Sequence, residues 1–113
     1  MWIFTETGFL SAMRKDPESS ILTVRARDRE SISDLASNYN LKVVRTPMAD
    51  YPYRVEIDKA DFATWITKEV QLIEYNNFKN QVAATRGHKF AKLLGSVWST
   101  MLNAEDEEAR GDK

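Results

Sequence analysis

The chain has 113 residues, of which 42% are hydrophobic and 11% aromatic, with 16 Lys and Arg against 17 Asp and Glu. This length suits one hydrophobic core, and the apolar content is too high for a disordered chain. The absence of Cys excludes disulfides, thiolate metal sites and Cys nucleophiles. Because one His is also poor material for a metal site, we expect no metal and no other cofactor.

Charge is distributed unevenly along the chain. Residues 105–113 carry net −3 and the remainder carries net +2. We expect residues 104–113 to form an acidic, disordered tail behind a single α+β domain at residues 1–103. The start of the chain has no basic segment before a long apolar run, and no stretch reaches the roughly 18 apolar residues of a membrane span. We therefore expect a cytoplasmic protein with no membrane association.

Strand and turn signals open the chain. Residues 2–5 and 9–14 are predicted to form a hairpin, because Gly8 between them can adopt the positive φ of a tight turn. Apolar and polar residues alternate over 21–27, which predicts a half-buried strand. The first three predicted strands thus precede any helix.

Helices and strands then alternate. Helical apolar spacing predicts a helix over about 28–40, followed by strands over 41–46 and 51–57. Asp58 is a candidate N-cap for a second helix that continues to about Tyr75.

Helical spacing resumes after residue 77, with a kink predicted near Gly87. It ends in the longest apolar stripe of the chain, which we expect to be chiefly core: Phe90, Leu93, Leu94, Val97, Trp98 and Met101. The order β-β-β-α-β-β-α-α indicates an α+β fold with an antiparallel sheet and helices on one face. Its middle part predicts a ferredoxin-like sandwich or a permuted variant of one.

Arginines mark the polar faces of two predicted strands. Arg25 and Arg27 alternate with apolar residues in one strand, and Arg54 does so in another. Arginine binds carboxylate and phosphate groups through two parallel hydrogen bonds, so these three are candidate binding residues. The alternative is an ordinary solvated face with cross-strand Arg–Glu pairs.

Sheets that bind RNA add exposed aromatic rings on which bases stack. The candidates in this sequence are Tyr51 or Tyr53, with Phe9. Because Tyr53 shares a strand face with Val55 and Ile57, we expect it in the core and count Tyr51 as the candidate. The nucleic-acid signal is therefore weak.

A second candidate surface combines amides, aromatic rings and cations. Asn offers both a donor and an acceptor, and the rings supply rigid contact area, so the cluster could form a groove for a ligand or partner. The alternative is a helix junction capped by Asn. The residues concerned are Tyr75, Asn76, Asn77, Phe78 and Lys79, together with Arg86 and Trp98.

Groups suited to catalysis are few. His88 has no Cys and no second His to complete a nucleophile–base pair or a zinc site. Glu56 and Asp58 could share a strand face and hold a divalent ion, although capping explains Asp58 better. We therefore predict that the protein is not an enzyme and has no catalytic residues.

Five segments carry a resemblance. Trp2–Phe9, Val24–Arg27, Ala49–Arg54, Tyr75–Lys79 and Val97–Met101 resemble the landmarks of a family of short, uncharacterised bacterial and phage-associated proteins. The resemblance covers about residues 1–103 and implies common ancestry. It implies no activity and no catalytic residues.

Two functional hypotheses follow. Compact size and the two candidate surfaces favour a non-enzymatic module that binds a protein partner in a regulatory or inhibitory role, of which phage-borne antagonism of a host defence complex is one version. The alternative is a nucleic-acid-binding module that uses Arg25, Arg27, Arg45 and Arg54. We rank it second because net +2 gives little attraction for a polyanion. The last apolar stripe could also cover a second copy of the chain, which leaves a homodimer open.

Overall fold

The computed structural model describes residues 1–109. The chain divides into two compact units, with the boundary between Glu74 and Tyr75. This boundary falls inside the segment for which we predicted a single domain. Each unit is described by itself below.

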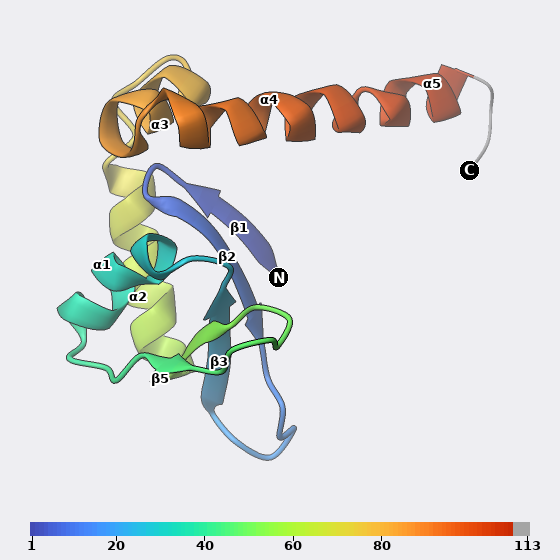
Figure 1. The fold of residues 1–113 in the computed structure, drawn as a ribbon. Coiled ribbons are helices and arrows are strands. Elements are labelled where there is room, and N and C mark those ends of the chain that lie inside the picture. The colour runs from blue at the N-terminus through green and yellow to red at the C-terminus, as the bar shows by residue number, and fades with distance from the viewer. Residues whose placement is uncertain (110–113) are drawn as a thin grey trace. The chain divides into compact units, whose positions relative to one another are not determined.

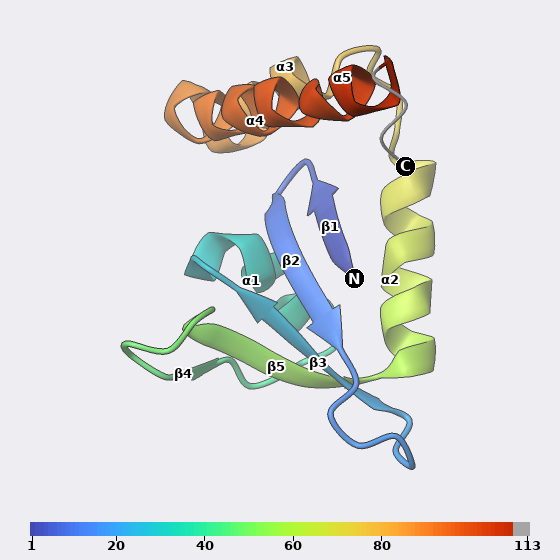
Figure 2. The ribbon, with the colours of Figure 1, turned by 90° about the vertical axis from the view of Figure 1, so that its right-hand side faces the viewer.

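The first unit holds a five-stranded sheet and two helices. Its elements are β1 (Trp2–Thr5), β2 (Gly8–Met13), β3 (Ile21–Ala26), α1 (Arg29–Asn38), β4 (Val44–Arg45), β5 (Tyr53–Asp58) and α2 (Lys59–Gln71). The strand order is β1-β2-β3-β5-β4, and every neighbouring pair is antiparallel (Figure 1, Figure 2). The predicted α+β class with an antiparallel sheet is confirmed.

The middle of the sheet has a split βαβ order. α1 connects β3 to β4, and β5 lies between those two strands. β2 pairs with the other edge of β3. The assignment to a ferredoxin-like or permuted fold stays a prediction.

The core lies between one face of the sheet and the two helices, which occupy the same side of the sheet in Figure 1. Alternate residues of β2, β3 and β5 point into it, as the period of two requires. Trp65 is 1% exposed, and its indole N–H donates to the Asp34 carboxylate at 2.9 Å, which ties α2 to α1. The buried apolar residues are Leu10, Ala12, Val24, Ala26, Ile32, Leu35, Ala36, Val55, Ile57, Phe62 and Trp65.

Local signals in the sequence explain several element ends. Gly8 has φ 148°, and the β1–β2 hairpin pairs Thr5 with Gly8, as predicted. Asp58 caps α2, since its carboxylate accepts from the Ala60 N–H at 2.9 Å. Asn40 adopts φ 52° just after α1, a conformation that Asn tolerates well.

Several predicted elements are shorter in the structure. Only Val44–Arg45 of the strand predicted over 41–46 pairs with β5. Tyr51 belongs to the turn before β5 rather than to the strand. The helix predicted to reach Tyr75 ends at Gln71. The next helix begins after Asn77, which has an extended backbone and caps it.

The second unit is helical as far as the structure describes it, with α3 (Phe78–Arg86), α4 (His88–Met101) and α5 (Asn103–Ala109). α3 packs against α4. The predicted kink is a complete break at Gly87, whose φ of 91° suits glycine. None of the helices that the structure describes is long and apolar enough to cross a bilayer.

The structure of this unit differs from two of the expectations. The apolar stripe of α4 is not chiefly core: Leu93, Trp98 and Met101 are 59–66% exposed, and Ala91 is the buried residue of the helix. Residues 104–109, predicted as part of a disordered tail, are helical and belong to α5. The rest of the predicted tail, 110–113, lies outside the described residues.

Candidate functional site

The face of the sheet opposite α1 and α2 carries a continuous set of aromatic and arginine side chains. The strand register brings together those of them that lie in strands, because directly paired residues of antiparallel strands share a face. Trp2 pairs with Ser11, Phe4 with Phe9, and Arg25 with both Ser11 and Arg54. We call this surface the outer face and define it by Trp2, Phe4, Phe9, Arg25, Arg27, Tyr51 and Arg54.

Three rings of the outer face pack on one another. Phe4 stacks on Phe9 with ring centres 4.7 Å apart, and Trp2 meets Phe9 edge-on at 5.8 Å. Both geometries are favourable for aromatic pairs. Trp2 nevertheless remains 71% exposed and Phe4 37% exposed. The hairpin therefore presents rigid aromatic area to solvent.

Tyr51 joins the rings to the arginines. Its ring lies 6.3 Å from that of Phe9, and the guanidiniums of Arg25 and Arg27 lie 4.6 and 4.2 Å from its centre. Cations at such distances are attracted by the ring face. Tyr51 is buried although it has φ 55°, a conformation that costs a bulky residue energy. The turn before β5 thus holds a strained residue in order to seat its ring on this face.

Arg25 and Arg54 are direct cross-strand partners, so two like charges face each other. The fold gives each guanidinium uncharged acceptors: Arg25 donates to the Ser11 hydroxyl at 2.9 Å, and Arg54 to the carbonyls of Asp50 and Tyr51 at 3.3 Å. The Nε atoms of both arginines are buried and have no hydrogen-bond partner within the described part of the chain. Like charges directly opposite destabilise a sheet, and this pair would be stabilised by an anionic group.

Acidic groups also lie at the outer face and limit its positive charge. Asp50 pairs with Arg27 at 2.9 Å. The Glu56 carboxylate accepts from the Thr23 hydroxyl at 3.1 Å. These contacts resemble the solvated polar face that was the alternative interpretation of the arginines.

One arginine of the predicted set is elsewhere. Arg45 pairs with Tyr53 in the β4–β5 ladder, and Tyr53 packs against the core as predicted. The Arg45 Nε donates to the Tyr53 hydroxyl at 3.2 Å. Arg45 therefore belongs to the opposite side of the sheet from Arg54, and the outer face has three of the four arginines in the nucleic-acid hypothesis.

The amide cluster predicted at 75–79 contains a cap. The Asn77 side chain accepts from the Asn80 N–H at 2.9 Å, as expected for a capped helix start. The rings of Tyr75 and Phe78 are 6.0 Å apart. Asn76 and Lys79 are exposed.

Arg86 lies at the other end of α3 from this cap. Its guanidinium covers the ring of Phe90 at 3.8 Å, so it joins α3 to α4. Trp98, further along α4, is 66% exposed. In its cap and its ring contacts the cluster matches the helix junction that was the alternative to a groove.

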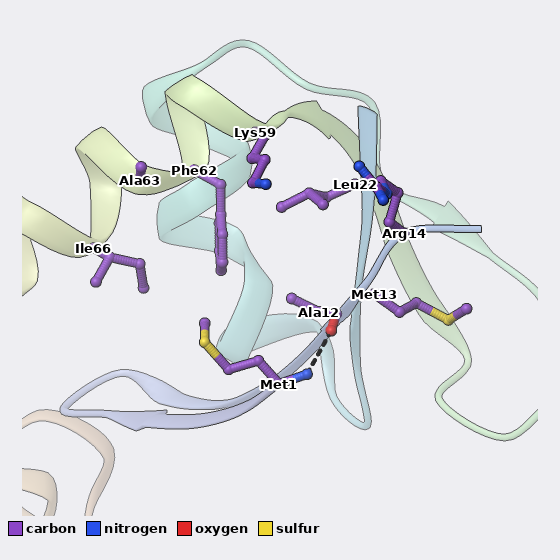
Figure 3. A pocket seen from close by; sticks show the side chains of 9 residues that line it. All are labelled: Met1, Ala12, Met13, Arg14, Leu22, Lys59, Phe62, Ala63 and Ile66. Carbon is purple, nitrogen blue, oxygen red and sulfur yellow. Dashed lines mark hydrogen bonds between the residues drawn. The ribbon is translucent and has the colours of Figure 1, made fainter. Parts of the chain in front are cut away.

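A cavity of about 420 Å³ opens between α2 and the ends of β2 and β3 (Figure 3). Apolar side chains such as Leu22, Phe62 and Ile66 line it, and Arg14 and Lys59 lie at its edge. Both cations are exposed, and no polar side chain among the lining residues is buried. A small ligand would find little there to fix its orientation.

The groups considered for chemistry have structural partners or are exposed. Asp58 is a cap that also accepts from the Ser20 hydroxyl at 3.0 Å, and His88 is exposed. Within residues 1–109, no three potential metal ligands among His, Asp and Glu lie together. Burial raises the pKa of Glu69 on α2, and the charges of Asp34 and Glu6 raise it further.

Sequence reasoning missed the two most exposed aromatic residues of the outer face. Trp2 and Phe4 alternate with Ile3 and Thr5, of which Ile3 packs against the core. That alternation was the available signal, and the hairpin register would have placed Phe9 on the same face as these two residues.

Comparisons of the chain with protein-family models, curated proteins and solved structures found no match. The resemblance to bacterial and phage-associated proteins stays a prediction.

Proposed function

We propose that the protein is a non-enzymatic binding module of a regulatory or inhibitory kind, whose outer face recognises a segment of another protein. The segment would carry an acidic side chain next to aromatic or aliphatic ones. The observation that supports this most is the Arg25–Arg54 pair beside the Phe4–Phe9 stack. Arg, Trp and Tyr are the residues that dominate binding energy at protein interfaces.

The arginines account for the acidic part of the segment. A carboxylate near Arg25 and Arg54 would interact favourably with both guanidiniums, which repel each other without it. Tyr51 and the carbonyls of the turn hold the guanidiniums in place, so little side-chain entropy is lost on binding.

The hairpin accounts for the apolar part of the segment. Trp2 is 71% exposed and rests on Phe9, so its ring is ordered before a partner arrives. Burial of such area contributes about 25 cal/mol per Å². The non-enzymatic part of the proposal is supported by the acidic residues, each of which has a structural role. Asp50 pairs with Arg27, Glu56 accepts a hydrogen bond from Thr23, and Asp58 caps α2.

Selection from a random peptide library tests the proposal without a known partner. The full chain would be the target, and the variant Trp2→Ser would be the counter-target that removes peptides binding elsewhere. We expect enriched peptides to combine Asp or Glu with aromatic or aliphatic residues, and to lose most of their affinity for Arg25→Gln. Trp98→Ser is the matched control, because Trp98 is 66% exposed but lies on α4. Failure to enrich any peptide over the counter-target would contradict the proposal.

A second candidate function, binding of single-stranded nucleic acid, is favoured by the exposed rings of Trp2 and Phe4 on an open sheet. Charge opposes it, since residues 1–74 contain 10 bases and 12 acids. Three arginines engaged with phosphates would give a log–log salt slope of about −2 for a single strand. We expect an oligouridine titration at low salt to show only weak binding. Tight binding with that slope, lost in Arg25→Gln, would favour the second candidate.

A further inference from the structure

Exposed apolar side chains of the second unit follow one another along α4 and its C-cap. Leu93, Trp98 and Met101 are 59%, 66% and 62% exposed, and Val97 and Leu102 are 39% and 40% exposed. α3 packs against α4, but it leaves these side chains in solvent. An apolar stripe of this length on a helix commonly marks an interface.

The helix that carries this stripe continues into α5. Leu102, the one residue between α4 and α5, has φ −58° and ψ −26°, which are helical values. Its N–H donates to the carbonyls of Trp98 and Ser99 at 3.3 Å. α4 and α5 accordingly follow one direction in Figure 1. We call this segment, His88–Ala109, the terminal helix.

The terminal helix has opposite charges at its two ends. Lys89 and Lys92 lie in its first turns, and residues 75–104 contain no acid at all. Its last turns carry four consecutive acids, residues 105–108. The apolar stripe lies between these two charged ends.

We propose that a second copy of this chain covers the stripe, with the two terminal helices packed antiparallel about a two-fold axis. An axis between Val97 and Trp98 lies at the centre of the stripe and brings Lys89 of one copy level with Asp106 of the other, next to Glu107. Such an interface is self-complementary, since the basic end of each helix meets the acidic end of its partner. In a parallel pair, Lys89 of one chain would face Lys89 of the other and the acids of the two chains would also face one another, so like charges would repel at both ends.

Helical geometry brings the charged side chains into reach. Lys89 and Glu107 are 18 residues apart, about five turns of an α-helix, so they lie on the same side of the terminal helix. Across a two-fold axis between antiparallel helices, residues of the same flank and opposite ends face each other. Each dimer would therefore contain two Lys89–Glu107 contacts, one at each end of the stripe.

Sedimentation velocity over a range of protein concentrations tests this arrangement. We expect the wild-type chain to be dimeric at high concentration. Lys89→Glu alone and Glu107→Lys alone should each weaken the dimer about tenfold, because two attractive contacts per dimer become repulsive. The chain with both substitutions should regain the wild-type dissociation constant. Circular dichroism of each variant checks that the helices are retained.

Two results would overturn the proposal. A wild-type chain that stays monomeric at every concentration would exclude self-association, and a double variant as weak as the single ones would exclude the antiparallel pairing. Trp98→Ser should abolish the dimer and leave peptide binding to the outer face intact. Trp2→Ser should abolish peptide binding and leave the dimer intact. This inference and the proposed function can therefore fail separately.

Discussion

Arg25 and Arg54 lie directly opposite each other in the ladder of β3 and β5. Two like charges in this position disfavour the sheet. The fold keeps them there with the ring of Tyr51, the Ser11 hydroxyl and two turn carbonyls, none of which carries a negative charge. An arrangement that is costly for the free protein and favourable next to an anion is expected of a binding surface.

This arrangement predicts a specific response to anions. We expect sulfate to raise the melting temperature of the wild-type chain more than it raises that of Arg25→Gln, at equal ionic strength. The comparison between variants removes the general stabilising effect of sulfate, which both share. Arg14→Gln, which removes an exposed arginine beside the cavity, should respond as wild type does. Equal responses of wild type and Arg25→Gln would contradict an anion site at this pair.

Tyr51 should be important for stability as well as for the site. Tyr51→Ala removes a buried ring and two cation–ring contacts, and we expect a loss of about 3 kcal/mol in the free energy of unfolding. Tyr51→Phe keeps the ring and should remain close to wild type. The free energy of unfolding of Tyr51→Gly should be about 1 kcal/mol higher than that of Tyr51→Ala, because glycine tolerates φ 55°. Urea unfolding followed by tryptophan fluorescence gives all three values.

Removal of the hydrogen bond between α1 and α2 should also lower the free energy of unfolding. Asp34→Ala leaves the buried indole N–H of Trp65 without its acceptor, which should cost about 1–3 kcal/mol. Asp34→Asn retains an oxygen acceptor and should cost less. Equal stability of Asp34→Ala and wild type in urea unfolding would show that the hydrogen bond contributes nothing.

The raised pKa of Glu69 predicts how the stability of the folded chain changes with pH. Burial, and then the charges of Asp34 and Glu6, raise its pKa in the folded chain above the value in the unfolded chain. The folded state therefore binds the proton more tightly, and stability is lost as pH rises through the ordinary carboxyl range and beyond it. Glu69→Gln should be more stable than wild type at neutral pH, and the difference should vanish in acid. A constant difference from acid to neutral pH would contradict this pKa shift.

Much of the fold follows from short-range signals in the sequence. Gly8 and Asp58 mark a hairpin and a helix start by their own chemistry, and alternation over 21–27 assigns the buried face of β3. The strand order depends on pairings between residues that are far apart, such as Val24 with Val55, which single-segment patterns do not specify.

The candidate site was only partly predictable for the same reason. Arg25, Arg27 and Arg54 were identified from alternation, but the contact of Tyr51 with two of them depends on an unusual backbone conformation in a turn. The exposure of Trp98 could not be deduced from its apolar spacing, because the same spacing serves a core helix and an interface helix.

Backbone amide chemical-shift mapping with a selected acidic peptide is the most direct test that the outer face is the binding site. We expect shifts confined to β1, β2, β3, β5 and the turn at Tyr51, including the indole N–H of Trp2. Binding should be lost in Trp2→Ser and kept in Trp98→Ser. Shifts centred on α4 or on the cavity beside α2, or full affinity in Trp2→Ser, would contradict the assignment of the outer face as the binding site.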